Sequence, residues 1–252
     1  MSRKKSFIIL GVLAATVFLW PRPAHAMHIA EGILPLGWSA LWFAVAAPFV
    51  WWGLHTINRR RIADSRAPTM IAMVGAGVFL VSCMPVPIPL VGTCSHPCGT
   101  GLAALLIGPA PTVVVASIAL FLQALFLAHG GLTTLGANVL SMGIVGAYAA
   151  YGSFRLLRAV RLPMFAAALI AGAIADWATY AATSLTLSLA LCDNSSPWPM
   201  FAAVLLALVP TQLPLGIAEG ILTAVAYRFV STRRPELLNA VTDSRAAAGV
   251  SS

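Results

Sequence analysis

Long apolar segments, separated by short polar, glycine-rich or proline-rich breaks, make up most of this chain. After residue 26 they run approximately over residues 36–54, 69–86, 102–128, 137–154, 163–191 and 200–230. A membrane-spanning helix needs about 20 mostly apolar residues, and helices and closed barrels are the structures that satisfy their backbone in lipid. The pattern therefore predicts an all-α, polytopic integral-membrane bundle of about six to seven helices over residues 27–234. The Ala- and Ser-rich residues 235–252 are expected to form a flexible tail.

The first 26 residues have a different pattern. A positively charged start is followed by a short apolar run and by Ala24-His25-Ala26, which has the small residues that a signal peptidase requires. We predict a cleavable signal peptide over residues 1–26, so that the mature chain begins at Met27. An uncleaved first transmembrane helix is the alternative.

Composition supports a membrane protein and excludes several other classes. The chain is 60% hydrophobic and only 9% charged, whereas soluble domains are about 25% charged. A soluble enzyme, a disordered chain and a nucleic-acid binder are thus excluded. Four of the basic residues behind the net charge of +8 lie in the first 26 positions, and most others form short clusters between apolar segments.

These arginine clusters predict the orientation in the membrane. Loops rich in Lys and Arg face the cytoplasm, which places the C-terminus inside and the mature N-terminus on the periplasmic or extracellular side of a bacterial inner membrane. An odd number of crossings is then needed between Gly101 and Arg155. We predict seven crossings or near-crossings, with an irregular or re-entrant path around residues 85–111. Such a path is tolerated where it lines a cavity, so this region is a candidate site.

The predicted mature N-terminus has metal-binding chemistry. The amine of Met27, the backbone nitrogen of His28 and its imidazole can close chelate rings around one divalent ion, and nitrogen ligands suit late first-row metals. His96 lies in a loop on the same predicted side, so Met27, His28 and His96 are the candidate ligands. Residues expected around them are Ser95, Cys94, Cys98 and Glu31.

Other polar residues leave alternatives open. Cys94 and Cys98 could form a short disulfide, be inert, or bind a soft metal. His129 is interpreted as a capping or packing residue. Asp176 and Glu219 lie inside apolar segments, where carboxylates are costly; they either hydrogen-bond to Gln212, Thr179 or Asn138, or have a function.

The sequence contains no motif of a known enzyme mechanism. It lacks a nucleophile elbow, a His-Glu-x-x-His pair, a Walker A loop and a dinucleotide fingerprint. We therefore expect no catalytic residues and no enzymatic cofactor. Uphill transport would need a partner that hydrolyses ATP.

Four spaced motifs resemble one family. Residues 27–35 (MHIAEGILP), 94–102 (CSHPCGTGL), 123–138 (QALFLAHGGLTTLGAN) and 211–220 (TQLPLGIAEG) are similar to CbiM, the cobalt-binding S component of energy-coupling-factor ABC transporters and sister of the nickel component NikM. The resemblance implies a membrane protein that captures Co²⁺ through Met27, His28 and His96. It also implies a transmembrane coupling subunit, cytosolic ATPases and a small membrane accessory subunit as partners.

Cys98 departs from the family pattern, in which threonine is expected at this position. Its sulfur either stiffens the loop through a disulfide or offers a softer ligand, which affects the choice between cobalt and another metal. Uptake of Ni²⁺ or another late metal is the first alternative function. A membrane-bound metal-dependent enzyme and an assembly subunit without a ligand are the others.

Overall fold

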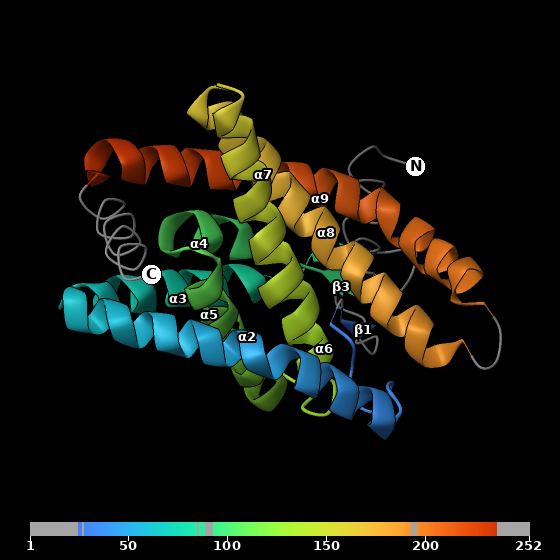
Figure 1. The fold of residues 1–252 in the computed structure, drawn as a ribbon. Coiled ribbons are helices and arrows are strands. Elements are labelled where there is room, and N and C mark those ends of the chain that lie inside the picture. Colours follow the sequence, from blue (N-terminus) through green and yellow to red (C-terminus); the bar gives the residue numbers. More distant parts are fainter. Residues whose placement is uncertain (1–24, 27, 85, 89–92, 193–195, 236–252) are drawn as a thin grey trace, which may run out of the picture.

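The computed structural model describes residues 25–26, 28–84, 86–88, 93–192 and 196–235, with backbone only for 25–26, 86–88 and 93–95. Within these ranges the protein is a bundle of helices with one small sheet (Figure 1). The longer helices are α2 (Leu36–Ala63), α3 (Ala67–Ser82), α5 (Pro109–Phe126), α8 (Met164–Leu191) and α9 (Pro197–Arg233). Between them lie α4 (Thr100–Ile107), α6 (Leu135–Asn138), the π-helix η1 (Val139–Gly146) and α7 (Ala147–Ala159).

The helices confirm the predicted fold class of a polytopic membrane bundle. Of the described helices, α2, α5, α8 and α9 are long and apolar enough to cross a bilayer, and α3 is a shorter apolar helix. Because α6, η1 and α7 follow one another without a gap, they form one continuous helical segment over residues 135–159. Pro210 and Pro214 lie inside α9 without ending it.

The long apolar stretch at residues 102–128 forms a helical hairpin. Helix α4 is almost entirely buried, and Gly108, with φ +82°, separates it from α5. The rings of His96, just before α4, and His129, just after α5, lie 4.9 Å apart, so α4 and α5 run in opposite directions. Between Gly101 and Arg155, α5 is long and apolar enough to cross a bilayer, whereas α4 has only 8 residues, so the predicted odd number of crossings stays a prediction.

A small sheet precedes α4. Strand β3 (Thr93–Ser95) lies between β1 (His25–Ala26), with which it pairs in parallel, and β2 (Val86–Ile88), with which it pairs antiparallel. The register joins His25 to Thr93 and Ala26 to Cys94. The sheet therefore brings the segment before His28 beside the segment before His96.

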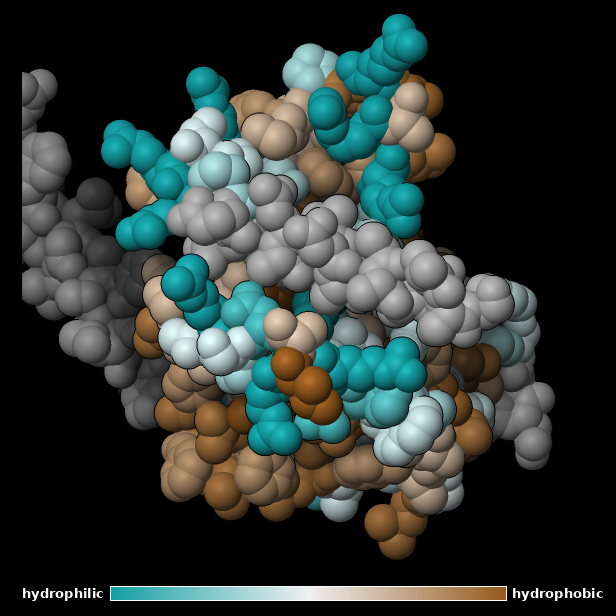
Figure 2. Space-filling view, turned by 60° about the vertical axis from the view of Figure 1, so that its left-hand side comes forward, coloured by the Kyte–Doolittle hydropathy of each residue, from teal (hydrophilic) through white to brown (hydrophobic). Residues whose placement is uncertain are grey.

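The described arginines gather at one end of the bundle, which we call the arginine-bearing end: Arg59, Arg60, Arg61, Arg66, Arg155, Arg158, Arg161, Arg228, Arg233 and Arg234. They lie in the last turns of α2, α7 and α9 or in the short segments that follow these helices. Phe154 and Tyr227, with ring centroids 5.2 Å apart, join the last turns of α7 and α9. Figure 2, viewed toward the side where α2 and α9 end, shows hydrophilic residues gathered there.

Small residues let α8 and α9 pack closely. A Cβ atom on Gly172 would meet Thr223, and one on Gly220 would meet the backbone of Leu169. Close backbone approach through small residues is common between membrane helices. Here it brings Asp176, one turn after Gly172, beside Glu219.

Candidate metal-binding site

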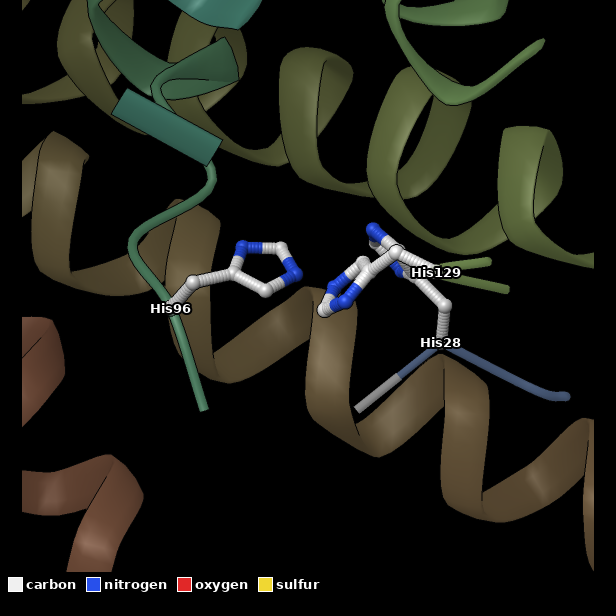
Figure 3. Close-up of side chains that lie close together, drawn as sticks. All are labelled: His28, His96 and His129. Carbon is white, nitrogen blue, oxygen red and sulfur yellow. The ribbon is translucent and has the colours of Figure 1, made fainter. Parts of the chain in front are cut away.

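Three histidines from distant parts of the chain meet at the end opposite the arginines. The ring centroid of His28 lies 4.6 Å from the ring centroid of His96 and 5.0 Å from that of His129. One nitrogen of each ring lies within 4.8 Å of one nitrogen of each other ring. Figure 3 shows the rings facing one another, with His96 approaching from one side and His28 and His129 from the other.

Each of the three rings has one buried nitrogen without a hydrogen-bond partner. The Nε2 atoms of His28, His96 and His129 are each buried without a hydrogen-bond partner. The whole residues are also buried for His28, which is 4% exposed, and for His96, which is 0% exposed. The Nδ1 atom of His96 lies 3.0 Å from the carbonyl oxygen of Pro97, so this nitrogen carries the proton and Nε2 keeps a free lone pair. A hydrogen bond at one ring nitrogen commonly prepares the other for metal binding.

Electrostatics favour the neutral, metal-binding form of these rings. Burial, together with the neighbouring His96 and His129, holds the pKa of His28 well below its usual value. Burial and His129 lower the pKa of His96 to about 4, and burial lowers the pKa of His129. Because imidazole binds metals in its neutral form, all three rings are ready to bind a divalent ion near neutral pH.

Hydrogen bonds to the backbone hold His28 in place through its neighbour Ile29. The side-chain Oδ1 of Asn138 accepts the Ile29 N–H at 2.9 Å, and its Nδ2 donates to the Ile29 carbonyl at 3.2 Å. The Thr134 hydroxyl donates to the same carbonyl. An unpaired buried backbone group would cost about 1–3 kcal/mol, so these bonds fix the segment that carries His28.

The loop that carries His129 is joined to the same segment. Glu31 is exposed, and its carboxylate accepts the Thr133 N–H at 3.1 Å. The Thr133 side chain and, to a smaller extent, this N–H hold the pKa of Glu31 below its usual value. Glu31 thus links the His28 segment to the His129 loop and is not placed against the rings. A Cβ atom on Gly130 would lie 3.2 Å from the Cβ of His28.

The structure brings together two of the predicted ligands and adds a third residue. His28 and His96 meet as expected, whereas Met27 and the side chains of Cys94 and Ser95 lie outside the described part of the structure. The interpretation of His129 as a capping or packing residue missed its place beside them. Its position directly before Gly130-Gly131, in a loop after an apolar segment, was the available signal.

Cys98 lies in a second cluster, with Asp176 and Glu219, and all three are buried. Its thiol is free, so of the three alternatives left open for this cysteine the disulfide does not hold. The oxygens of Glu219 accept the N–H groups of Cys98 and Gly99, each at 2.8 Å. Glu219 therefore holds the loop that carries His96 through backbone N–H groups, which the alternatives of Gln212, Thr179 or Asn138 did not include.

Comparisons with known proteins agree on one family. Residues 28–237 match CbiM, described as the cobalt uptake substrate-specific transmembrane region. The chain is 54% identical to the "Cobalt transport protein CbiM" of Sorangium cellulosum over 89% of this chain and 100% of that protein. It is 52% identical to the protein of the same name from Geobacter sulfurreducens, over 86% of this chain and 62% of that protein.

Solved structures agree with the fold. A structure described as a truncated transition metal transporter matches with a TM-score of 0.72 and 27% identity, covering 81% of this chain and 97% of that one. Another, described as a transition metal transporter, matches with the same TM-score and 26% identity, covering 81% and 92%.

Proposed function

Because the chain belongs to the CbiM family of cobalt uptake substrate-specific transmembrane proteins, we propose that it captures Co²⁺ for an energy-coupling-factor type uptake transporter. The relatives are named as transport proteins, so the chain is a transport protein and not an enzyme. Cobalt is the transported substrate in this proposal.

One observation carries the proposal: three histidine rings, each with a buried Nε2 atom that lacks a hydrogen-bond partner, each place one nitrogen within 4.8 Å of the others. Burying a polar group without a hydrogen bond costs free energy, and a bound cation would satisfy all three at once. Imidazole nitrogens suit late first-row metals, Co²⁺ among them. The neutral rings need no deprotonation before the ion binds.

The predicted N-terminus completes the proposed ligand set. After removal of residues 1–26, the amine of Met27 and the backbone nitrogen of His28 would join the imidazoles of His28 and His96, with His129 as a further nitrogen donor. The family match begins at residue 28, which supports a boundary near residue 26. Residues 27–234 would then form the metal-binding and transport domain.

The proposed partners follow from what the sequence lacks. Without a Walker A loop, the chain needs cytosolic ATPase subunits and a transmembrane coupling subunit to drive uptake, and a small membrane accessory subunit fits the same assembly. We place the protein in the bacterial inner membrane, with the mature N-terminus outside and the C-terminus, including residues 235–252, in the cytoplasm.

Replacing His96 tests the site directly. His96→Ala is expected to weaken Co²⁺ binding to the purified, processed protein by at least about 100-fold, beyond the 10–100-fold typical of losing an outer partner. The matched control is His55→Ala, because His55 is exposed and stacks on Trp51. Equal affinity in both variants would contradict the histidine site, and parallel titrations with Ni²⁺ test the alternative metal.

Lengthening the N-terminus tests the amine. One alanine placed before Met27 in the processed chain moves the amine by one residue, so chelation with the His28 backbone is lost while all three imidazoles remain. We expect a large loss of Co²⁺ affinity by equilibrium dialysis. Full affinity would show that the amine is not a ligand.

A further inference from the structure

Cys98, Asp176 and Glu219 form a buried cluster in which the two carboxyl groups hydrogen-bond to each other and one carboxylate oxygen is left over. All three residues are less than 2% exposed. Each offers one potential ligand atom, and these three atoms lie within 4.8 Å of one another. The Oδ2 atom of Asp176 has no hydrogen-bond partner. The neighbours that act on the two carboxyl groups are each other and, for Glu219, the N–H groups of Cys98 and Gly99.

Two adjacent carboxyl groups inside a protein need compensating positive charge. Burying an unpaired charge is very costly, so a shared proton or a bound cation must offset this pair. A proton satisfies the carboxyl groups alone, whereas a metal ion would also employ the thiol, whose Sγ lies 4.0 Å from Oδ1 of Asp176.

The hydrogen bonds of Glu219 leave room for an ion. Each of its oxygens accepts one backbone N–H, and a carboxylate oxygen has about two lone-pair sites. Each oxygen therefore keeps a site for a metal. With metal–ligand distances of about 2.0–2.3 Å, two ligands of one tetrahedral ion lie about 3.5 Å apart, so the observed spacing requires only small shifts.

We propose that Cys98, Asp176 and Glu219 form a second binding site for a divalent transition-metal ion. Sulfur and carboxylate oxygen together suit Co²⁺ and Zn²⁺. The ion displaces the thiol proton, and any proton held between the carboxyl groups, to water.

The place of the cluster indicates how the second site acts, and this step rests on the proposed function. Cys98 lies two residues after His96 on the same loop, so an ion bound at the second site would hold the segment that carries His96. A cavity of about 630 Å³ between α3, α4 and α9 is lined by Gly99 and Glu219 at one end and by Ser65 and Arg66 at the other. The second site thus lies between the histidines and a cavity that reaches the arginine-bearing end.

The test is a Co²⁺ titration of the full processed chain with two readouts. Elemental analysis after equilibrium dialysis counts the ions, and near-ultraviolet absorption detects charge transfer from thiolate to Co²⁺. We expect two ions and this absorption in the wild type. Cys98→Thr, which introduces the residue expected in the family, should retain one ion and lose the absorption. Asp176→Asn should weaken only the second ion.

Further variants separate the two sites. Cys192→Ser is the matched thiol control at the far end of α8, and Cys94→Ser excludes the neighbouring cysteine; both should retain the absorption. His96→Ala should lose one ion but keep the absorption, so the two proposals can fail independently. A wild type that binds one ion without thiolate absorption, or an absorption that survives Cys98→Thr, would overturn the second site.

Discussion

Gly130 shows how a residue without a side chain shapes the histidine site. Its φ of +82° lies in the left-handed region, and a Cβ atom there would be 3.2 Å from the Cβ of His28 and 3.3 Å from Nδ2 of Asn138. These are the neighbours that position the His28 segment. A side chain at this position would therefore both strain the backbone and displace the neighbouring His28.

Gly130→Ala is expected to reduce Co²⁺ affinity at least tenfold. The left-handed conformation alone costs an alanine roughly 1–2 kcal/mol, and about 1.4 kcal/mol corresponds to tenfold in binding. Gly152→Ala is the control, because a Cβ atom there meets nothing within 4 Å. The measurement is a Co²⁺ titration of both variants, and equal affinities would show that Gly130 does not shape the site.

Residue chemistry in the sequence was enough to select His28 and His96, but not to select His129. The chain brings residues about 100 positions apart into contact through Asn138 and Thr134, and sequence spacing carries no information on such contacts. Similarly, Asp176 and Glu219 were recognisable as unusual, yet the backbone N–H groups that Glu219 binds could be found only from the fold.

At the scale of elements, the short helix α4 is fixed at both ends by side chains of other helices. Glu219 of α9 accepts the N–H groups of Cys98 and Gly99, which directly precede the first turn of α4. An anion at this end of α4 also interacts favourably with the helix dipole. The guanidinium of Arg60, at the end of α2, donates to the carbonyl of Ile107 in its last turn. Helix α4, which follows the loop that carries His96, is thereby anchored to α9 at its start and to α2 at its end.

Arg60→Met tests this anchoring. Methionine keeps much of the buried length but loses the charged donor, and a hydrogen bond from a charged group contributes about 1.5–3 kcal/mol. We expect the Tm in detergent to fall by several degrees, with Arg61→Met, at an exposed neighbour, unchanged. A similar Tm for both variants would contradict a stabilising role for the Arg60 bond.

Apolar periodicity predicted the existence of the helices better than their interruptions. The predicted segment 102–128 contains Pro109 and Pro111, but the break falls at Gly108, where a positive φ is needed. Pro210 and Pro214 were equally visible, yet α9 continues through both. A proline ends a helix when no neighbouring packing compensates for its missing N–H, and that packing is a property of the folded bundle.

At the scale of the whole molecule, the separation of arginines from histidines predicts a direction in the membrane. Ser65 lies beside Arg66 in the turn between α2 and α3, at the arginine-bearing end. Ser196 lies between the end of α8 and the start of α9, at the other end of the bundle. Both residues are exposed, so cysteine is expected to be tolerated at either position. Because arginine-rich loops remain in the cytoplasm, the two positions should face opposite sides.

The measurement is labelling with a membrane-impermeant maleimide, with the four natural cysteines replaced by serine. We expect Ser196→Cys to react in intact spheroplasts and Ser65→Cys to react only in inside-out vesicles, since the reagent reaches one face in each preparation. The reverse pattern would invert the orientation and place the histidine site on the cytoplasmic side, which is incompatible with capture from outside. Labelling of both from one face would contradict the alternation of α2, α3, α8 and α9 across the bilayer.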